Sequence, residues 1–243
     1  MSHVLSAGPQ LVAEGIIGQE LFDQYAAEWL RISGAADGAE LTASFRAPHG
    51  DLRVSAVSFP VKCIAELLSA VGVRTIKARF LMVPDEHKRP HFSVALFATD
   101  ALDTRLTSYY LAEPFWKPRK DPAQDAPPLR MEIANVLAAH WATQWADVAR
   151  FPLTAQLFSS HYGPLRGYNF ELSDFMKPLL VLDKLGDQRL LLELGLHTHY
   201  GPGPSGEVFT ATFGLMVRLA GLQAEDGELD PEYDLATPIP PGS

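Results

Sequence analysis

The chain has few of the residues and segments that mark specialised protein classes. Its 243 residues include one cysteine, Cys63, which excludes an intrachain disulfide and a metal site built from several cysteines. No apolar run approaches the ~18 residues that a membrane-spanning helix needs. The first residues lack the basic and apolar regions of a secretory signal. We therefore expect a cytoplasmic protein without a membrane contact.

Basic residues and nucleotide-binding motifs are also scarce. Lys and Arg number 20 against 29 Asp and Glu, which gives a formal net charge of −9 at pH 7. Contacts with nucleic-acid phosphates need an excess of Lys and Arg, so we do not expect a nucleic-acid partner. Glycine-rich phosphate loops and the Gly-x-Ser-x-Gly hydrolase motif are absent. We therefore predict no catalytic residue and no cofactor, with a divalent metal as the one alternative considered below.

The composition that remains is that of a folded globular protein. Hydrophobic residues make up 47% of the chain and charged residues 20%. Related features recur at a nearly constant spacing, because Tyr25-Ala-Ala-Glu-Trp29 is matched 116 positions later by Trp141-Ala-Thr-Gln-Trp145. Gly72 and Gly186 each follow a predicted helix, and Phe92 precedes its predicted counterpart Phe209 by 117 positions. This spacing predicts a tandem duplication.

Each predicted unit contains two helices and a β-hairpin. We expect an α+β fold in which a helix-helix-β-hairpin unit is duplicated about a pseudo-twofold axis, with antiparallel sheet packed on helices. The first unit is assigned to residues 1–116 and the second to 129–223. A proline-rich linker occupies 117–128, and an acidic tail that ends in a proline-rich stretch occupies 224–243.

Periodicity places the individual elements. In the first unit we expect a helix near 21–30, a strand at 41–45, and a helix that Ser58 caps and Gly72 ends. Alternating residues predict a hairpin over 75–98 and a further strand at 104–111. In the second unit we expect helices at 130–150 and from Ser173 to Gly186. Its hairpin carries Leu190, Leu192, Leu194 and Leu196 on one face, with Arg189, Glu193, His197 and His199 on the other.

The two halves share a set of short motifs. The first half carries Glu28-Trp29, Gly72 and Arg74, followed by an apolar strand that ends at Asp100. The second half keeps Gln144-Trp145, Gly186 and Arg189 but has no Asp at the matching strand end. These motifs resemble those of a family of small uncharacterised bacterial α+β proteins. That family has no assigned activity, so the resemblance implies an α+β fold and no catalytic residue.

The segment 159–170 is a candidate binding region, because it combines a histidine, an arginine and aromatic side chains with turn residues. Tyr and Arg contribute strongly to the binding energy of protein interfaces. The candidate partner-binding or ligand-binding residues are His161, Tyr162, Arg166, Tyr168 and Tyr200. The alternative is a connection between helices, in which the aromatic side chains cover the edge of the core.

The His197-Thr-His199 sequence is a candidate metal site. Residues two apart on a strand project from the same face, so both imidazoles can reach one ion, with His161 as the candidate third ligand. His140, from the same half of the chain, is an alternative candidate for the third ligand. The alternative is an ordinary polar strand face.

These patterns favour a non-catalytic protein-interaction or assembly protein of the bacterial cytosol, which binds a protein partner or itself. The alternative is a small metal-dependent enzyme or ligand-binding protein centred on His161, His197 and His199. A third hypothesis is that the acidic tail masks the basic first hairpin, which carries Lys77 and Arg79.

Overall fold

The computed structural model describes most of both predicted units. The described residues are 15–35, 38–46, 53–115, 135–147, 151–160, 163–180, 182, 186, 188–203, 206–220, 232–233 and 237–238. The predicted linker at 117–128 lies outside them, and of the tail only residues 232–233 and 237–238 are included. In the described part of the chain, no helix has the length and apolar character needed to cross a membrane.

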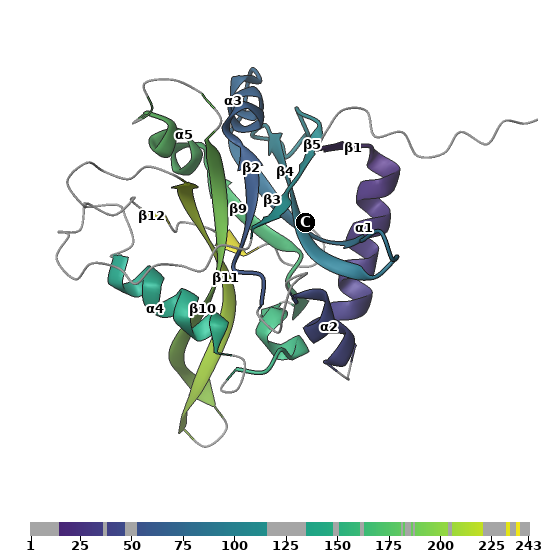
Figure 1. Ribbon diagram of the computed structural model, residues 1–243. Helices are drawn as coiled ribbons and strands as arrows, with labels where there is room; N and C mark the ends of the chain where they lie inside the picture. The colour runs from purple at the N-terminus through teal and green to yellow at the C-terminus, as the bar shows by residue number, and fades with distance from the viewer. Residues whose placement is uncertain are drawn as a thin grey trace, which may run out of the picture.

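Two antiparallel sheets face each other, and helices flank them (Figure 1). The six-stranded sheet has the order β1-β5-β4-β3-β9-β13, the five-stranded sheet has the order β12-β11-β10-β2-β6, and β7 pairs with β8. The chain is therefore mixed α+β, as the sequence predicts. The strands are β1 (Ile16–Ile17), β2 (Ala56–Pro60), β3 (Thr75–Pro84), β4 (Pro90–Thr99), β5 (Tyr109–Leu111), β6 (Glu113–Phe115), β7 (Ser159–Ser160), β8 (Gly163–Pro164), β9 (Gly167–Glu171), β10 (Arg189–Gly203), β11 (Gly206–Ala220), β12 (Glu232–Tyr233) and β13 (Thr237–Pro238).

The helices lie on the outer sides and at one end of the paired sheets. Helix α1 packs on β3, α4 packs on β10, and α3 and α5 contact each other (Figure 1). The five helices described are α1 (Gln19–Ser33), α2 (Ala39–Ser44), α3 (Val61–Ser69), α4 (Asn135–Ala146) and α5 (Leu172–Leu180), and a 3-10 turn, η1, spans Ala155–Phe158.

The two hairpins each take their third strand from the other half of the sequence. Strand β2 pairs with β10 over five residues, from Pro60 opposite Arg189 to Ala56 opposite Glu193. Strand β9 pairs with β3 over five residues, from Glu171 opposite Thr75 to Gly167 opposite Arg79. Because each strand crosses to the other sheet, neither sheet is complete without both halves. We call β2 and β9 the exchanged strands.

The helix-cap prediction for Ser58 is wrong, because residues 56–60 form β2 and α3 begins only after Pro60. Proline has no backbone N–H and a fixed φ, so it ends the strand and suits the start of a helix. The Ser173 prediction is also wrong in detail: α5 begins at Leu172, and the Asp174 carboxylate accepts the Glu171 N–H at 2.9 Å.

Two further strand predictions are wrong. Residues 41–45, predicted as a strand, lie in and just after helix α2, whose Ala, Glu and Leu residues favour a helix. Of the strand predicted at 104–111, only β5 is formed as a strand of the sheet. A tight turn precedes it, since the Asp100 carboxylate accepts the N–H groups of Leu102 at 2.9 Å and Thr104 at 2.8 Å.

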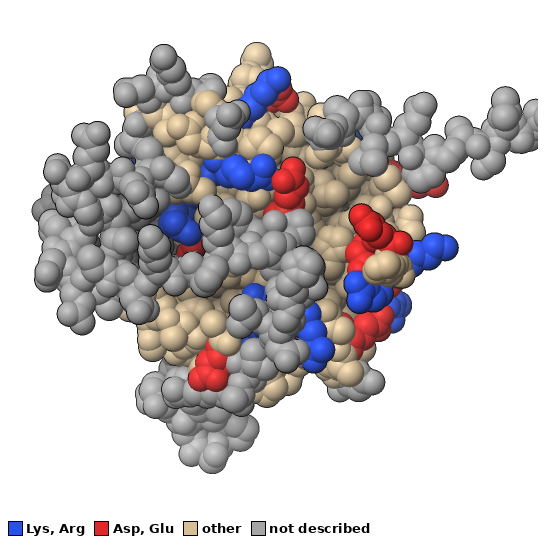
Figure 2. Space-filling view, viewed as in Figure 1, with Lys and Arg blue, Asp and Glu red and all other residues tan. Residues whose placement is uncertain are grey.

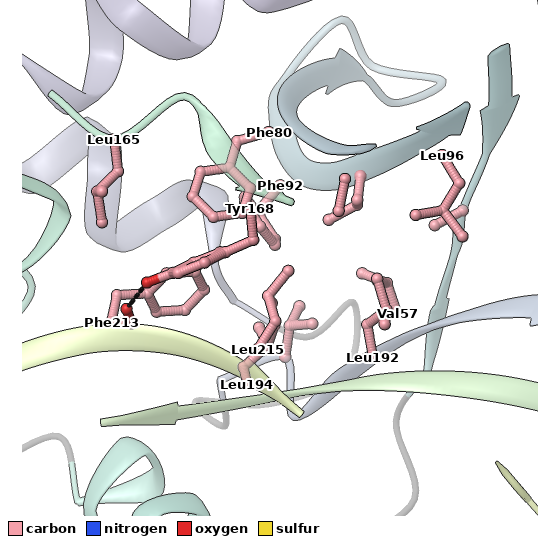
Figure 3. Close-up of a cluster of buried hydrophobic side chains, with 14 of the residues drawn as sticks. Val57, Phe80, Phe92, Leu96, Leu165, Tyr168, Leu192, Leu194, Phe213 and Leu215 are labelled. Carbon is pink, nitrogen blue, oxygen red and sulfur yellow. Dashed lines mark hydrogen bonds between the residues drawn. The ribbon is translucent and has the colours of Figure 1, made fainter. Parts of the chain in front are cut away.

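The core lies between the two sheets (Figure 3). Phe80 and Phe92 come from the six-stranded sheet and meet Phe213 of β11, with ring centroids 5.5 and 6.0 Å from that of Phe213. The exchanged strand β2 adds Val57, which is fully buried. The side chain of Phe209, the predicted counterpart of Phe92 in the second unit, lies outside the described set.

Two buried tryptophans hydrogen-bond to the backbone just before each exchanged strand. Trp29 of α1 donates its indole N–H to the Leu165 carbonyl at 2.7 Å, and Trp145 of α4 donates to the Val54 carbonyl at 2.7 Å. Each carbonyl lies two residues before an exchanged strand that belongs to the other half. Both indoles are only 1% exposed, so these bonds form away from water.

We expect Trp29→Phe and Trp145→Phe each to lower the free energy of unfolding by about 1–3 kcal/mol, because a buried carbonyl loses its donor. Urea denaturation followed by circular dichroism measures this. Trp141→Phe is the matched control, since Trp141 is only partly buried. An equal loss in all three variants would contradict the assigned role of the indole N–H groups.

Candidate functional site

Besides His140, which lies on α4, the structure describes three of the predicted site side chains. His161 and Tyr162 lie outside the described residues. The backbones of His199 and Tyr200 belong to β10, where they pair with Thr210 and Phe209, but their side chains are not described. Arg166, Tyr168 and His197 remain, and they occupy three different environments.

Tyr168 is a core residue. It is 4% exposed and lies on β9 with its ring against Phe80, at 5.8 Å between centroids. Its hydroxyl donates to the Phe213 carbonyl of β11 (Figure 3). The hydroxyl therefore ties an exchanged strand of one sheet to the backbone of the other sheet. It is not available at a surface for a partner.

Arg166 immediately precedes β9 and belongs to the six-stranded sheet. Its carbonyl accepts the Phe80 N–H at 2.9 Å, and its side chain is partly exposed. The predicted binding segment 159–170 is thus not one loop, because β7, β8 and β9 all lie in it. Tyr168 is a core residue, whereas Arg166 is only partly buried.

His197 lies on β10, on the face opposite the core, as the sequence alternation predicts. Its ring stacks on Trp141 of α4, with centroids 3.8 Å apart and planes at 17°. The imidazole also lies against Gly214 of β11. A Cβ atom added at Gly214 would lie only 2.6 Å from Nε2 of His197, so a larger residue at this position would collide with the ring. The imidazole is therefore packed between a helix and a glycine, which is a structural environment.

Polar groups around His197 already have partners. Nε2 of Gln144 lies 3.1 Å from the Thr198 hydroxyl and 3.0 Å from Nε2 of His140. The Glu193 carboxylate accepts from Nε of Arg218 at 2.9 Å. Among the described residues, no group of three or more His, Cys, Asp or Glu side chains could hold a metal ion. A site completed by His161 and His199 stays a prediction.

Cys63 lies in the first turns of α3 and is partly buried. Burial raises the pKa of the Cys63 thiol, and the charge of Glu66 raises it further. Both effects keep the sulfur protonated at neutral pH, whereas a nucleophilic cysteine needs a lowered pKa. The structure therefore gives no support to a reactive thiol at this position.

The outer edge of β11 is a candidate contact surface that the sequence analysis missed. Among the described strands, only β12 pairs with this edge, and it pairs with Val217 and Arg218. Residues 211–216 have no strand partner on that side within the described part of the chain. The signal in the sequence is that residues 208–217 contain no charge and no proline. We call residues 211–216 the β11 edge.

Charge does not mark a site on the face shown in Figure 2, where basic and acidic side chains lie next to one another. Arg189, for example, lies 2.7 Å from the Glu113 carboxylate, measured from Nη2. The chain matches no protein-family model, no curated protein and no solved structure with which it was compared.

One half-buried histidine predicts a pH dependence of stability. His91 lies on β4 opposite Val83, and its Nδ1 is buried without a hydrogen-bond partner among the described residues. Burial lowers the pKa of His91, and the charge of Asp85 partly opposes this. Below about pH 6.5 the unfolded chain therefore binds a proton that the folded chain resists, and stability falls as the pH falls.

We expect His91→Gln to lose less stability than the wild type between pH 7 and pH 5, as measured by urea denaturation at each pH. His87→Gln is the matched control, because His87 lies exposed in the same hairpin turn. Equal pH dependence in His91→Gln and the wild type would exclude His91 as the group that titrates.

Proposed function

We propose that this protein is a non-catalytic interaction or assembly protein of the bacterial cytosol, and that the β11 edge is its contact surface. The observation that carries this proposal is that residues 211–216 have no strand partner on their outer side among the described residues. The N–H and C=O groups of an edge strand are a template for pairing with another chain, and of those in the β11 edge the Phe213 carbonyl already accepts the Tyr168 hydroxyl.

The composition of the β11 edge suits a contact. Edge strands that must stay unpaired usually carry Lys, Pro or a bulge. Residues 211–216 read Ala-Thr-Phe-Gly-Leu-Met and have neither Lys nor Pro. The side chains of Phe213 and Leu215 fill the core, so the strand is held in one register. A partner strand would meet a fixed pattern of donors and acceptors.

The length of the β10–β11 hairpin also supports a role in contacts with another molecule. Strands β10 and β11 are 15 residues long, whereas β3 and β4 are 10 residues long. The extra length carries the hairpin beyond the body of the molecule, at the bottom of the view in Figure 1. A projecting hairpin with an unpaired edge can reach a second molecule without a change in the body.

The simplest occupant is the β11 edge of a second copy. Antiparallel pairing of identical edges gives an isologous, twofold contact, the commonest symmetry of homo-oligomers. It would join two five-stranded sheets into one continuous sheet.

We also infer that the chain is a tandem duplication with an internal pseudo-twofold axis. In each half an exchanged five-residue strand leads directly into a helix of 9 residues and then a hairpin. The registers of the two exchanged strands correspond, and Trp29 and Trp145 make corresponding bonds. A fused homodimer with exchanged strands would have this organisation.

The test is Thr212→Lys, which puts a charge on the β11 edge at a partly exposed side chain. We expect the wild type to show a concentration-dependent dimer in sedimentation velocity. The two lysines of a paired Thr212→Lys dimer repel, and the dissociation constant should rise by about tenfold or more.

The matched control is Thr104→Lys, the same change in the exposed turn before β5. It should dimerise as the wild type does, and both variants should unfold in one cooperative transition in urea, which shows that they are folded. A monomeric wild type, or equal dimerisation of the two variants, would overturn the proposal.

A further inference from the structure

Two short segments of the chain each cross from one sheet to the other. In the first half, β5 pairs with β4 of the six-stranded sheet, and β6 pairs with β2 of the five-stranded sheet. In the second half, β12 pairs with β11 of the five-stranded sheet, and β13 pairs with β9 of the six-stranded sheet. We call residues 109–115 the first strap and residues 232–238 the second strap. Each strap therefore contacts both sheets.

The two straps have the same register on the hairpins. Tyr110 lies opposite Leu96 of β4, and Tyr233 lies opposite Val217 of β11. Both Leu96 and Val217 lie three positions before the end of their hairpin ladder. The tyrosine of each strap therefore occupies the same place on its hairpin.

The two straps also have the same register on the exchanged strands. Pro114 lies opposite Val57 of β2, and Pro238 lies opposite Tyr168 of β9. Both Val57 and Tyr168 lie three positions before the end of the ladder that their exchanged strand forms with a hairpin. Proline suits these positions, because β6 and β13 are each the last strand in their sheet and an edge strand tolerates a missing N–H.

The sequences of the two straps agree with these registers. Leu111-Ala112-Glu113-Pro114 in the first strap is matched by Leu235-Ala236-Thr237-Pro238 in the second. The tyrosine that precedes each run is one position farther away in the second strap, where Asp234 is added. This agreement supports the duplication proposed above, with the second strap as part of the second unit.

Within the described part of the chain, the second strap is held less firmly than the first. Strand β5 lies between β4 and β1, and the Leu111 N–H donates to the Gly15 carbonyl at 2.7 Å. The Ala112 carbonyl also accepts the Ser93 hydroxyl at 3.1 Å. Strands β12 and β13 are each the outermost strand of their sheet and pair over only two residues. Short outer strands with few pairs open at a low cost in free energy.

We propose that the second strap swaps between two copies of this chain, so that residues 232–238 of each copy pair with β9 and β11 of the other. Such a swap keeps every strap pairing and changes only which copy supplies the strap, so it costs little. Residues 221–231 connect β11 to the strap and can span up to ~40 Å when extended, which is enough to reach a neighbouring molecule.

The partner is a second copy because the segment that fits this site belongs to the chain itself. The strap site is already matched to a tyrosine and a Leu-Ala-x-Pro run by the registers on β9 and β11. The swap does not rest on pairing of the β11 edges, since the strap uses Val217 and Arg218 and the β11 edge is residues 211–216.

The test is a disulfide that forms between copies. Thr237 lies opposite Asn169, and such residues have Cα atoms about 4.5–5.5 Å apart, which suits a disulfide. Full-length Asn169→Cys and Thr237→Cys are made separately in a Cys63→Ser background, which removes the one natural thiol. The two proteins are mixed, incubated and oxidised, and non-reducing electrophoresis with mass spectrometry measures the covalent heterodimer.

We expect the heterodimer in a yield about tenfold or more above the matched control, Asn169→Cys mixed with Pro238→Cys, because neighbouring strand residues point to opposite faces. The yield should rise with protein concentration. In a double variant, Asn169→Cys with Thr237→Cys, kept dilute, the same disulfide should form within one chain, as the pairing of β13 with β9 requires.

A second measurement leaves β9 unchanged, in case Asn169→Cys does not fold. Thr237→Cys carrying a thiol-reactive benzophenone is mixed with isotope-labelled chain, with Cys63→Ser in both, and illuminated. Mass spectrometry then shows whether the β9 peptide attached to position 237 is labelled, and so comes from another copy. We expect labelled β9 peptides in a share that grows with the concentration of labelled chain.

Two results would overturn the proposal. One is cross-links that form only within one chain, with no heterodimer above the control at any concentration. The other is the absence of any cross-link between position 237 and β9.

Thr212→Lys separates the strap swap from the β11 edge contact. The heterodimer should form equally well in Thr212→Lys and Thr104→Lys backgrounds. Its loss in Thr212→Lys alone would mean that the β11 edges bring the two cysteines together, and would overturn the swap. A heterodimer that persists while neither lysine variant alters dimerisation would support the swap and count against the β11 edge.

Discussion

The structure depends on the backbone pairing of two short strands with hairpins from the other half of the chain. Strand β2 completes the sheet of β10 and β11, and β9 completes the sheet of β3 and β4. A lone two-stranded hairpin is marginal in water, and a third strand gives it a stable hydrophobic face. The exchange also brings Val57 and Tyr168 into one shared core, so the packing of each half relies on the other.

The strand exchange also determines which strand edges remain on the outside of the two sheets. It covers the inner edges of both hairpins, at β3 and β10, and leaves β4 and β11 on the outside. Strand β5 covers part of β4, while the described tail covers only Val217 and Arg218 of β11. The two sheets therefore differ in how far their outer edges are paired within the described part of the chain.

The sequence predicted the elements whose periodicity extends over many residues. The two hairpins, the helices around Trp29 and Trp145, and the outward position of His197 follow from spacing alone. The exchanged strands were missed because five residues are too few for a clear alternation, and both faces of β2 are buried. Tyr168 was taken for a surface residue because nothing local shows that its hydroxyl reaches a carbonyl 45 residues away in sequence.

The central claim is that neither half folds alone, and separating the halves tests it most directly. The chain is cut within the proline-rich segment 117–128, and the two pieces are produced apart and together. We predict no cooperative unfolding transition for either piece alone, and a one-to-one complex with a cooperative transition when they are combined. A single half that unfolds cooperatively, with protected amides in its own hairpin, would contradict the account.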